Sequence, residues 1–334
     1  MNIQLILYKI KSKARQKVIG LFRNKNYYYK LYTSYWHSTL SRPSVKQSGL
    51  NYYSAVPNPL AGIGHQLANW IAGYWYAKQF GLSFAYIPFS QSKWETFFGF
   101  GQDEVSVSEL VIKKGYKKVN LPLFDETNQN EINLTKKIIQ SYAGENVVFV
   151  AEQDQFYKDQ YGVIPDIKKK FYNASARKND NLIFSKSHYN IAIHVRRGDI
   201  TIGQQNGNEN LLMRWQTNDY FQKVLRTTVE NLVVEKPIAI YLFSQGVKAD
   251  FKEFENFNNI HFCLDMGAQD SFIQMVYADL LITSKSSFSY KPALLNKGIK
   301  VCPRNFWHGY PESQDWILVE DNGNFEVNKL NILI

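Results

Sequence analysis

Cysteines are scarce in this sequence: only Cys263 and Cys302 occur among its 334 residues, and both fall in apolar, strand-like stretches. Unpaired thiols of this kind are typical of a cytoplasmic protein, and we expect both side chains to pack in the interior. The six histidines are scattered without the spacing of metal ligands, and no Asp-x-Asp pair occurs. The sequence therefore predicts neither a structural zinc site nor a carboxylate site for a catalytic metal.

Long hydrophobic runs are also lacking. The apolar stretch near the N-terminus covers about six residues, whereas a transmembrane helix needs roughly 20. No small-residue cleavage site follows that stretch. We therefore expect neither a membrane anchor nor a signal peptide.

Acidic residues are missing from the first 94 positions, which hold twelve of the 39 lysines and arginines. The rest of the chain carries 27 basic and 29 acidic residues, so the net charge of +10 is an N-terminal property. Residues 1–30 mix these bases with apolar residues, which predicts a basic amphipathic helix on an anionic membrane surface. A solvated basic tail is the alternative. We expect no nucleic-acid partner, because no nucleic-acid module accompanies the bases.

The most informative stretch joins an apolar strand to a cluster of charge. Residues 189–195 form the predicted strand, and His194, Arg196, Arg197 and Asp199 stand at its carboxyl end. Ligands of open α/β sheets bind outside the carboxyl ends of the strands. Two adjacent guanidiniums there favour an anion such as a diphosphate. The alternative is an exposed ion pair between Arg197 and Asp199 that binds no ligand.

A glycine loop provides a second candidate for anion binding. Gly62 and Gly64 precede a predicted helix over residues 64–80, whose free amides and dipole attract negative charge at the N-terminus. The loop lacks the full dinucleotide fingerprint, because Leu67 stands where the third glycine would fall. A hydride-transfer enzyme is therefore not favoured.

A serine cluster follows another predicted strand, over residues 279–283. Ser284, Ser286 and Ser287 open the next helix, so hydroxyls and free amides converge on a spot that fits a phosphate. Ordinary helix capping, which needs one serine, is the alternative. The phosphate interpretation is favoured because both strands belong to one predicted sheet. Lys285 adds charge there or points to solvent.

The order of the elements predicts an α/β protein with two parallel-sheet domains. Strands and helices alternate regularly from residue 189 to a strand over residues 299–302. A strand, glycine loop, helix and strand indicate a related first half, although residues 90–180 are less legible. We expect three regions: a basic extension (1–48), a first domain (49–182) and a second domain (183–334).

Three segments resemble the fucosyltransferase superfamily, which includes the bacterial α-1,2-fucosyltransferases of glycosyltransferase family 11, the α-1,6 enzymes and the protein O-fucosyltransferases. They are the glycine loop with the residues up to Asn69, the His-x-Arg-Arg-x-Asp motif, and residues 279–290 with their Ser-Ser-Phe-Ser run. The segments occur in the family's order, and the matching region covers roughly residues 55–305. The resemblance implies a GT-B-like fold, two Rossmann-like domains facing across a cleft. The first would bind the acceptor and the second the nucleotide-sugar donor.

The resemblance also implies roles for individual residues. Arg196 would contact the diphosphate, Arg197 and Asp199 would hold the loop in shape, and His194 would orient the site or the nucleotide. A packed core histidine is the alternative for His194. The full set of expected donor contacts is Gly62, Gly64, His65, His194, Arg196, Arg197, Ser286, Ser287 and Phe288.

His65 stands where the protein O-fucosyltransferases carry asparagine in the glycine loop. An imidazole at this place could take the proton of the acceptor hydroxyl, bind donor phosphate or cap the helix. Asp199 is the competing base. The departure also leaves the donor sugar and the acceptor open.

We therefore expect an inverting, metal-independent glycosyltransferase without a cofactor. It would transfer fucose from GDP-fucose to a glycan or lipid-linked glycan in surface polysaccharide biosynthesis, in the cytoplasm and peripherally at the inner membrane face. Two alternatives stay open: the same fold with another nucleotide sugar, and a non-catalytic glycan- or membrane-binding protein. Arg196, Ser286 and Ser287 together favour a catalyst, because a scaffold needs no two convergent anion sites.

Overall fold

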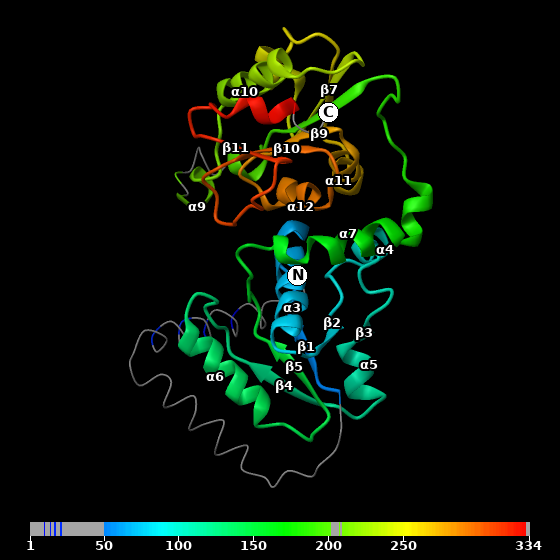
Figure 1. Ribbon diagram of the computed structural model, residues 1–334, viewed down its shortest axis with the longest axis vertical. Helices are drawn as coiled ribbons and strands as arrows, with labels where there is room; N and C mark the ends of the chain where they lie inside the picture. Colours follow the sequence, from blue (N-terminus) through cyan, green and yellow to red (C-terminus); the bar gives the residue numbers. More distant parts are fainter. Residues whose placement is uncertain are drawn as a thin grey trace.

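The computed structural model describes residues 50–201, 207 and 209–331, together with the isolated positions 10, 14, 17 and 21. Within this part, the chain forms two domains, each built on a parallel sheet with helices against its faces (Figure 1). This is the two-domain α/β arrangement expected from the sequence. Most of the predicted basic extension and of its amphipathic helix lies outside the described residues.

The first sheet, as described, has five parallel strands in the order β3-β2-β1-β5-β4. The strands are β1 (Tyr52–Ala55), β2 (Ser83–Tyr86), β3 (Val105–Ser106), β4 (Lys117–Leu121) and β5 (Val147–Ala151). Every residue of β5 is buried, as expected of an apolar run in a parallel strand that is covered on both faces.

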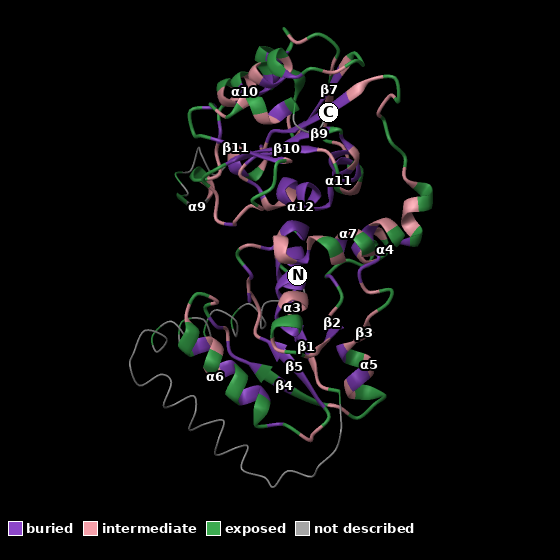
Figure 2. Cartoon of the chain, in the orientation of Figure 1, coloured by how far each residue is buried: buried purple, intermediate pink, exposed green. Residues whose placement is uncertain are grey.

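Helices pack on both faces of this sheet. The helices of the domain are α3 (Ile63–Gln79), α4 (Ser92–Phe98), α5 (Val107–Ile112), α6 (Gln129–Gln140) and α7 (Ile164–Asn173), with 3-10 turns η1 (Tyr161–Val163) and η2 (Ser175–Asn179). Residues of α3 and α6 share one apolar cluster with one face of the sheet, and α5 shares another with the opposite face. In Figure 2 the central strands of the sheet are buried, whereas α5 and α6 also carry exposed residues. Gly81, at φ +65°, ends the long helix α3 as the sequence predicts.

The second sheet, within the same described range, has six parallel strands in the order β11-β10-β9-β6-β7-β8. The strands are β6 (Tyr189–His194), β7 (Ile238–Ser244), β8 (Ile260–Leu264), β9 (Leu280–Ile282), β10 (Ile299–Pro303) and β11 (Trp316–Val319). The helical elements are α9 (Glu209–Leu212), α10 (Asn218–Asn231), η3 (Lys248–Phe254), α11 (Ala268–Tyr277), α12 (Ser287–Leu295) and η4 (Val327–Asn331). Helix α10 packs on one face, and α11 and α12 pack on the other.

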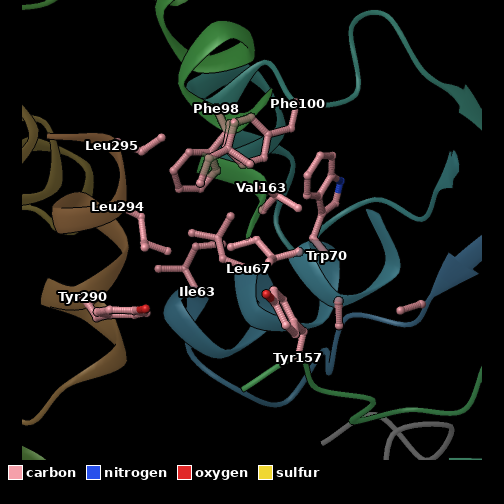
Figure 3. Packing of buried hydrophobic residues seen from close by; sticks show 14 of the residues in the cluster. Ile63, Leu67, Trp70, Phe98, Phe100, Tyr157, Val163, Tyr290, Leu294 and Leu295 are labelled. Atoms are coloured by element: carbon pink, nitrogen blue, oxygen red, sulfur yellow. The ribbon is translucent and has the colours of Figure 1, made fainter. Parts of the chain in front are cut away.

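The two domains share one apolar core where they meet. Ile63 and Leu67 of α3 point toward Tyr290 and Leu294 of α12 (Figure 3). Tyr172 of α7 adds a hydrogen bond from its hydroxyl to the Leu295 carbonyl, at 3.0 Å. This shared burial fixes how the N-termini of α3 and α12 lie relative to each other.

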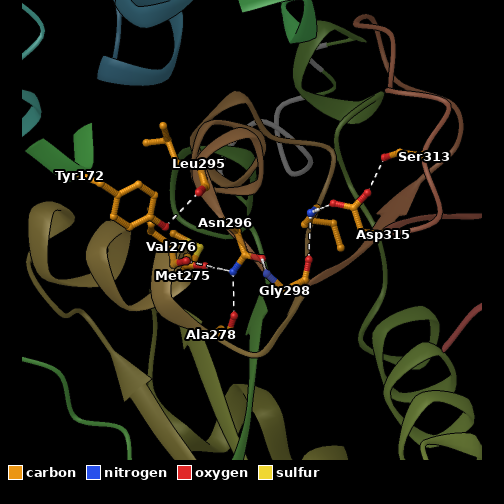
Figure 4. Close-up of polar contacts among 10 residues, drawn as sticks. Tyr172, Met275, Val276, Ala278, Leu295, Asn296, Gly298, Ser313 and Asp315 are labelled. Atoms are coloured by element: carbon orange, nitrogen blue, oxygen red, sulfur yellow. Dashed lines mark hydrogen bonds and ion pairs between the residues drawn. The ribbon is translucent and has the colours of Figure 1, made fainter. Parts of the chain in front are cut away.

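Asn296 follows the last residue of α12 and anchors the carboxyl end of this helix through hydrogen bonds. Its side-chain amide donates to three carbonyls at the end of α11, at 2.8 to 3.1 Å (Figure 4). Its carbonyl oxygen accepts from the Gly298 amide at 2.7 Å. These bonds satisfy carbonyls that a helix end leaves without partners. They hold α12, and therefore its N-terminus, in place.

Some elements differ from the sequence-based expectation. The alternation of strands and helices in the second half also predicts a helix over residues 247–256. This segment is instead the 3-10 segment η3, in which Phe251 leaves helical geometry at φ −128°. Its buried aromatic side chains, not a regular helical repeat, place it against the sheet. The sequence did not predict strands β3, β4 and β11. Strands β3 and β11 are short and β4 is largely polar, so none of them shows a clear alternation of apolar and polar residues. No helix among the described residues is long and apolar enough to cross a bilayer.

Candidate functional site

A cleft of about 700 Å³ lies between the two domains. Its walls come from both of them: Ala61, Gly62, Ile63, Gly64, His65, Phe156 and Lys158 from the first, and Arg196, Asp199, Arg214, Ser286, Ser287, Phe288 and Trp307 from the second. The three motifs that the sequence singled out therefore meet around one space.

The position of the cleft follows from the order of the strands. From β1 the chain runs to β2 and β3 on one side, while β5 and β4 lie on the other side. In the second sheet, β6 is likewise followed by β7 and β8 on one side, with β9 to β11 on the other. Such switch points leave a crevice at the carboxyl ends of the strands, where ligands of α/β proteins bind. Both crevices contribute to this cleft.

Gly64 allows the two helix N-termini to meet. A Cβ atom at this position would lie 2.7 Å from the Ser287 backbone carbon and 2.9 Å from the Phe288 backbone nitrogen. No larger residue fits without separating α3 from α12. The glycine that the sequence assigned to anion binding therefore has a packing role here, and the close approach brings both helix dipoles to one wall of the cleft.

Ser286 caps helix α12. Its hydroxyl accepts a hydrogen bond from the Phe288 amide at 3.2 Å, which is the capping that the sequence left as the alternative. Ser286, Ser287 and Phe288 nevertheless all line the cleft. Capping and anion binding are thus compatible, because the first turn of a helix has further free amides. Lys285 turns away and pairs with Asp321 at 2.8 Å.

Arg196 follows β6 and enters the cleft as expected. One terminal nitrogen donates to Asp199 at 2.6 Å, while its Nε is buried and has no hydrogen-bond partner among the described residues. The Asp199 side chain is 57% exposed. A buried donor without a partner costs stability, and a bound anion could provide the missing partner. The ion pair that the sequence allowed between Arg197 and Asp199 is formed by Arg196 instead.

Arg214 is a second cation in the cleft that sequence reasoning missed. It lies in the turn after α9, where no periodic pattern draws attention to it. Its Nε is also buried without a partner among the described residues. Burial lowers the pKa of this guanidinium, and the nearby Arg196 lowers it further. Among the described residues, the cleft wall carries three cationic side chains, namely Lys158, Arg196 and Arg214, and one carboxylate, that of Asp199. This excess of positive charge favours a negatively charged ligand.

Arg197 lies outside the cleft wall. Its guanidinium donates to the carbonyl of Gln216 at 3.1 Å, forms a short hydrogen bond with Asn218, and stacks on the Trp215 ring at 4.3 Å. These contacts use its donors within the protein. The structure thus places Arg197 in the loop-holding role, while its role as a direct donor contact stays a prediction.

His194 is buried beneath the cleft. Its Nδ1 lies 2.8 Å from the Ser284 hydroxyl, so it ties the end of β6 to the loop after β9. Burial lowers its pKa to about 3, with a further contribution from the cations of Arg196 and Arg197. The ring is therefore neutral at physiological pH. This favours orientation of the loop over proton transfer.

His65 stands at the N-terminus of α3 and pairs with an acid that the sequence did not single out. Its Nε2 lies 3.0 Å from Oδ1 of Asp154, and its ring packs edge-on against Phe156. Asp154 follows β5, whose apolar run at residues 147–151 is the clearest predicted element within residues 90–180. Ligand sites of α/β proteins lie beyond the carboxyl ends of the strands, so the position of Asp154 after this strand could have identified it from the sequence.

Two chemistries are thus available in one cleft. Arginines, serines and helix N-termini can hold an anion, and an imidazole paired with a carboxylate can take up a proton. Among the described residues, no group of three or more acidic, histidine or cysteine side chains is arranged to hold a metal ion.

No protein-family model and no curated protein matches the chain. The chain is similar to the solved structure of POFUT1 in complex with GDP, at 12% identity and a TM-score of 0.47, covering 77% of this chain and 99% of that one. It is similar to a variant of Arabidopsis thaliana FUT1 in complex with GDP, at 9% identity and a TM-score of 0.44, covering 81% and 74%. The fucosyltransferase NodZ from Bradyrhizobium is similar at 11% identity and a TM-score of 0.45, covering 84% and 98%.

Proposed function

We propose that this protein is an inverting glycosyltransferase that transfers fucose from GDP-fucose to a hydroxyl group of a glycan. The observation that carries the proposal is the pair of cleft arginines, Arg196 and Arg214. Each has a buried Nε without a partner among the described residues, and both line the same cleft as the N-terminus of α12. A diphosphate supplies the charge and the acceptor oxygens that these groups lack.

The donor side follows from the charge that develops in the reaction. When a nucleoside diphosphate leaves an anomeric carbon, negative charge grows on its β-phosphate and the sugar becomes oxocarbenium-like. Preorganised donors at that phosphate lower the barrier more than they tighten the ground state. Arg196, Arg214 and the serines of α12 take this role, which a divalent cation takes in metal-dependent transferases.

The acceptor side uses the first domain. His65 takes the proton from the acceptor hydroxyl while that oxygen attacks the anomeric carbon. The base comes from one domain and the leaving-group contacts from the other. A single displacement between them inverts the anomeric configuration.

Fucose and GDP are chosen because the three cleft motifs resemble the fucosyltransferase superfamily. A second candidate keeps the reaction and changes the sugar nucleotide. His65 favours that candidate, because it stands where the protein O-fucosyltransferases carry asparagine.

A screen of nucleotide sugars tests the donor. We expect GDP and GDP-fucose to raise the melting temperature, since a ligand at 100 times its Kd stabilises by about 2.7 kcal/mol. UDP-, dTDP- and CMP-sugars at the same concentration serve as matched controls. A shift with another nucleotide alone would change the donor, and the absence of any shift would overturn the proposal.

The acceptor is proposed to be a glycan or lipid-linked glycan of a surface polysaccharide, reached at the inner membrane face. The support is the basic sequence of residues 1–30, which suits an anionic surface. We expect deletion of residues 2–30 to weaken binding to vesicles that contain anionic lipid, with turnover of a soluble acceptor unchanged. Vesicles of neutral lipid are the control. Equal binding of both proteins to the anionic vesicles would contradict a membrane contact by this segment.

A further inference from the structure

We propose that Asp154 is a positioning residue that holds His65 as the proton acceptor for a neutral hydroxyl group. The inference rests on the proposed function and specifies it, because it names the group that orients the base and the class of acceptor that needs one. Asp154 is not part of the cleft wall, whereas His65 is. Asp154 therefore acts through the imidazole.

Three segments converge to build this arrangement. Strands β1 and β5 are parallel neighbours in register, with Ala55 opposite Ala151. Asn58 and Asp154 each stand three residues beyond these matched positions, at the switch point of the first sheet. His65 comes from the helix that follows β1. The topology thus brings the three side chains together although 89 residues separate His65 from Asp154.

The carboxylate of Asp154 is fixed from its other side by Asn58. The Asn58 side-chain amide donates to both carboxylate oxygens, at 3.1 and 3.2 Å. Asn58 is itself held, because its backbone amide donates to Asn69 and its side-chain oxygen accepts from the Leu60 amide, both at 3.0 Å. A chain of hydrogen bonds thus runs from the buried Asn69 of α3 to His65.

The backbone of Asp154 also has an uncommon conformation. Its φ is +70°, in the left-handed region that residues other than glycine rarely adopt. Such conformations persist where the surrounding structure enforces them, and they cluster at functional sites. Glycine would relieve the strain here but could not orient His65.

The contact decides which ring nitrogen of His65 is basic. A carboxylate only accepts hydrogen bonds, so Nε2 carries the proton and donates to Asp154, which leaves the lone pair on Nδ1. The other charged groups of the described cleft wall are Lys158, Arg196, Asp199 and Arg214. Asp199 is already bound to Arg196, so Asp154 is the carboxylate that contacts the ring.

The proton and electron changes balance without a further reactant. The acceptor oxygen forms a bond to the anomeric carbon, the bond from that carbon to the phosphate oxygen breaks, and its electron pair leaves with the diphosphate. The hydroxyl proton moves to Nδ1 of His65. Asp154 then stabilises the imidazolium. This assistance matters for a neutral hydroxyl acceptor, whereas a carboxylate or phosphate acceptor has no proton to lose.

The test is Asp154→Asn, which keeps the shape and removes the charge. We expect transfer to a neutral hydroxyl acceptor to fall roughly 10- to 10³-fold, less than on loss of the base itself. GDP affinity and melting temperature should stay near those of the parent protein. The loss should appear in kcat and not in the KM values for donor and acceptor, because Asp154 is not part of the cleft wall. Asp166→Asn, which breaks the ion pair with Lys78 on the same domain, is the matched control.

A double variant separates positioning from a structural role. In the His65→Ala background, Asp154→Asn should change transfer by no more than about threefold, because the group that it orients is gone. Multiplicative effects of the two changes, or a loss in Asp154→Asn that appears in KM with kcat unchanged, would overturn the inference. These results differ from a failure of the proposed function, in which the parent protein neither binds nor uses a nucleotide sugar.

Discussion

Replacement of His65 by alanine is expected to lower glycosyl transfer by roughly 10²- to 10⁴-fold, which is the usual contribution of a positioned general base. Binding of GDP should change little, because the residues proposed to hold the diphosphate, Arg196, Arg214 and Ser287, line the cleft from the other domain. The measurement is kcat with saturating donor and acceptor, paired with a GDP titration. His188→Ala, at a half-buried histidine that is not part of the cleft wall, is the control.

His65→Asn tests whether the side chain at position 65 acts by taking up a proton or by hydrogen bonding alone. Asparagine restores the residue of the protein O-fucosyltransferases and can donate and accept hydrogen bonds, but it does not titrate near neutral pH. We expect it to be nearly as slow as alanine, because an amide side chain cannot take up the hydroxyl proton. If it transfers as fast as the parent with the same pH profile, position 65 works by hydrogen bonding, and Asp199 becomes the next candidate base.

Arg196→Lys is expected to reduce transfer by about 10²-fold or more with little change in melting temperature. Lysine keeps the charge but loses the planar fork, and with it the simultaneous contact to Asp199 and to a phosphate. The effect should appear in kcat more than in donor affinity, because the charge on the leaving group is largest in the transition state.

Arg226→Lys provides the matched control for that substitution. Arg226 lies on α10, stacks on the Phe257 ring at 5.6 Å, and is remote from the cleft wall. Activity of Arg196→Lys within a few-fold of the parent, at equal folded protein, would remove Arg196 from the leaving-group role.

The sequence predicts the second domain well because its strands are continuous apolar runs. Strand β6 and the charged residues after it were located within one residue, and the strand that the same alternation predicts over residues 260–264 is β8. In parallel strands buried on both faces, hydrophobicity alone marks the element. The same signal is weak over residues 90–180, where β4 begins with two lysines and has Asn120 between its apolar residues, and short helices carry little periodicity.

The partners of the candidate site residues could not be read from the sequence. Asp154 and Asn58 stand in loops, and Arg214 lies in a turn, where no repeat distinguishes them from other polar residues. The same limit applies to Arg197: adjacent arginines look equivalent in a sequence, yet one enters the cleft and the other stacks on Trp215. A strand or its following turn directs neighbouring side chains in opposite directions, so only the fold decides which one a ligand meets.

By itself, the sequence determined that two parallel sheets form and that Arg196, the serines of α12 and His65 stand at their carboxyl edges. Those conclusions depend on local features, namely apolar runs, glycines and capping residues, which act over a few positions of the chain. Only the tertiary structure decided that α3 meets α12 at Gly64 and that Asp154 reaches His65. These contacts join segments far apart in the chain, and they are set by strand order and by the core that the two domains share.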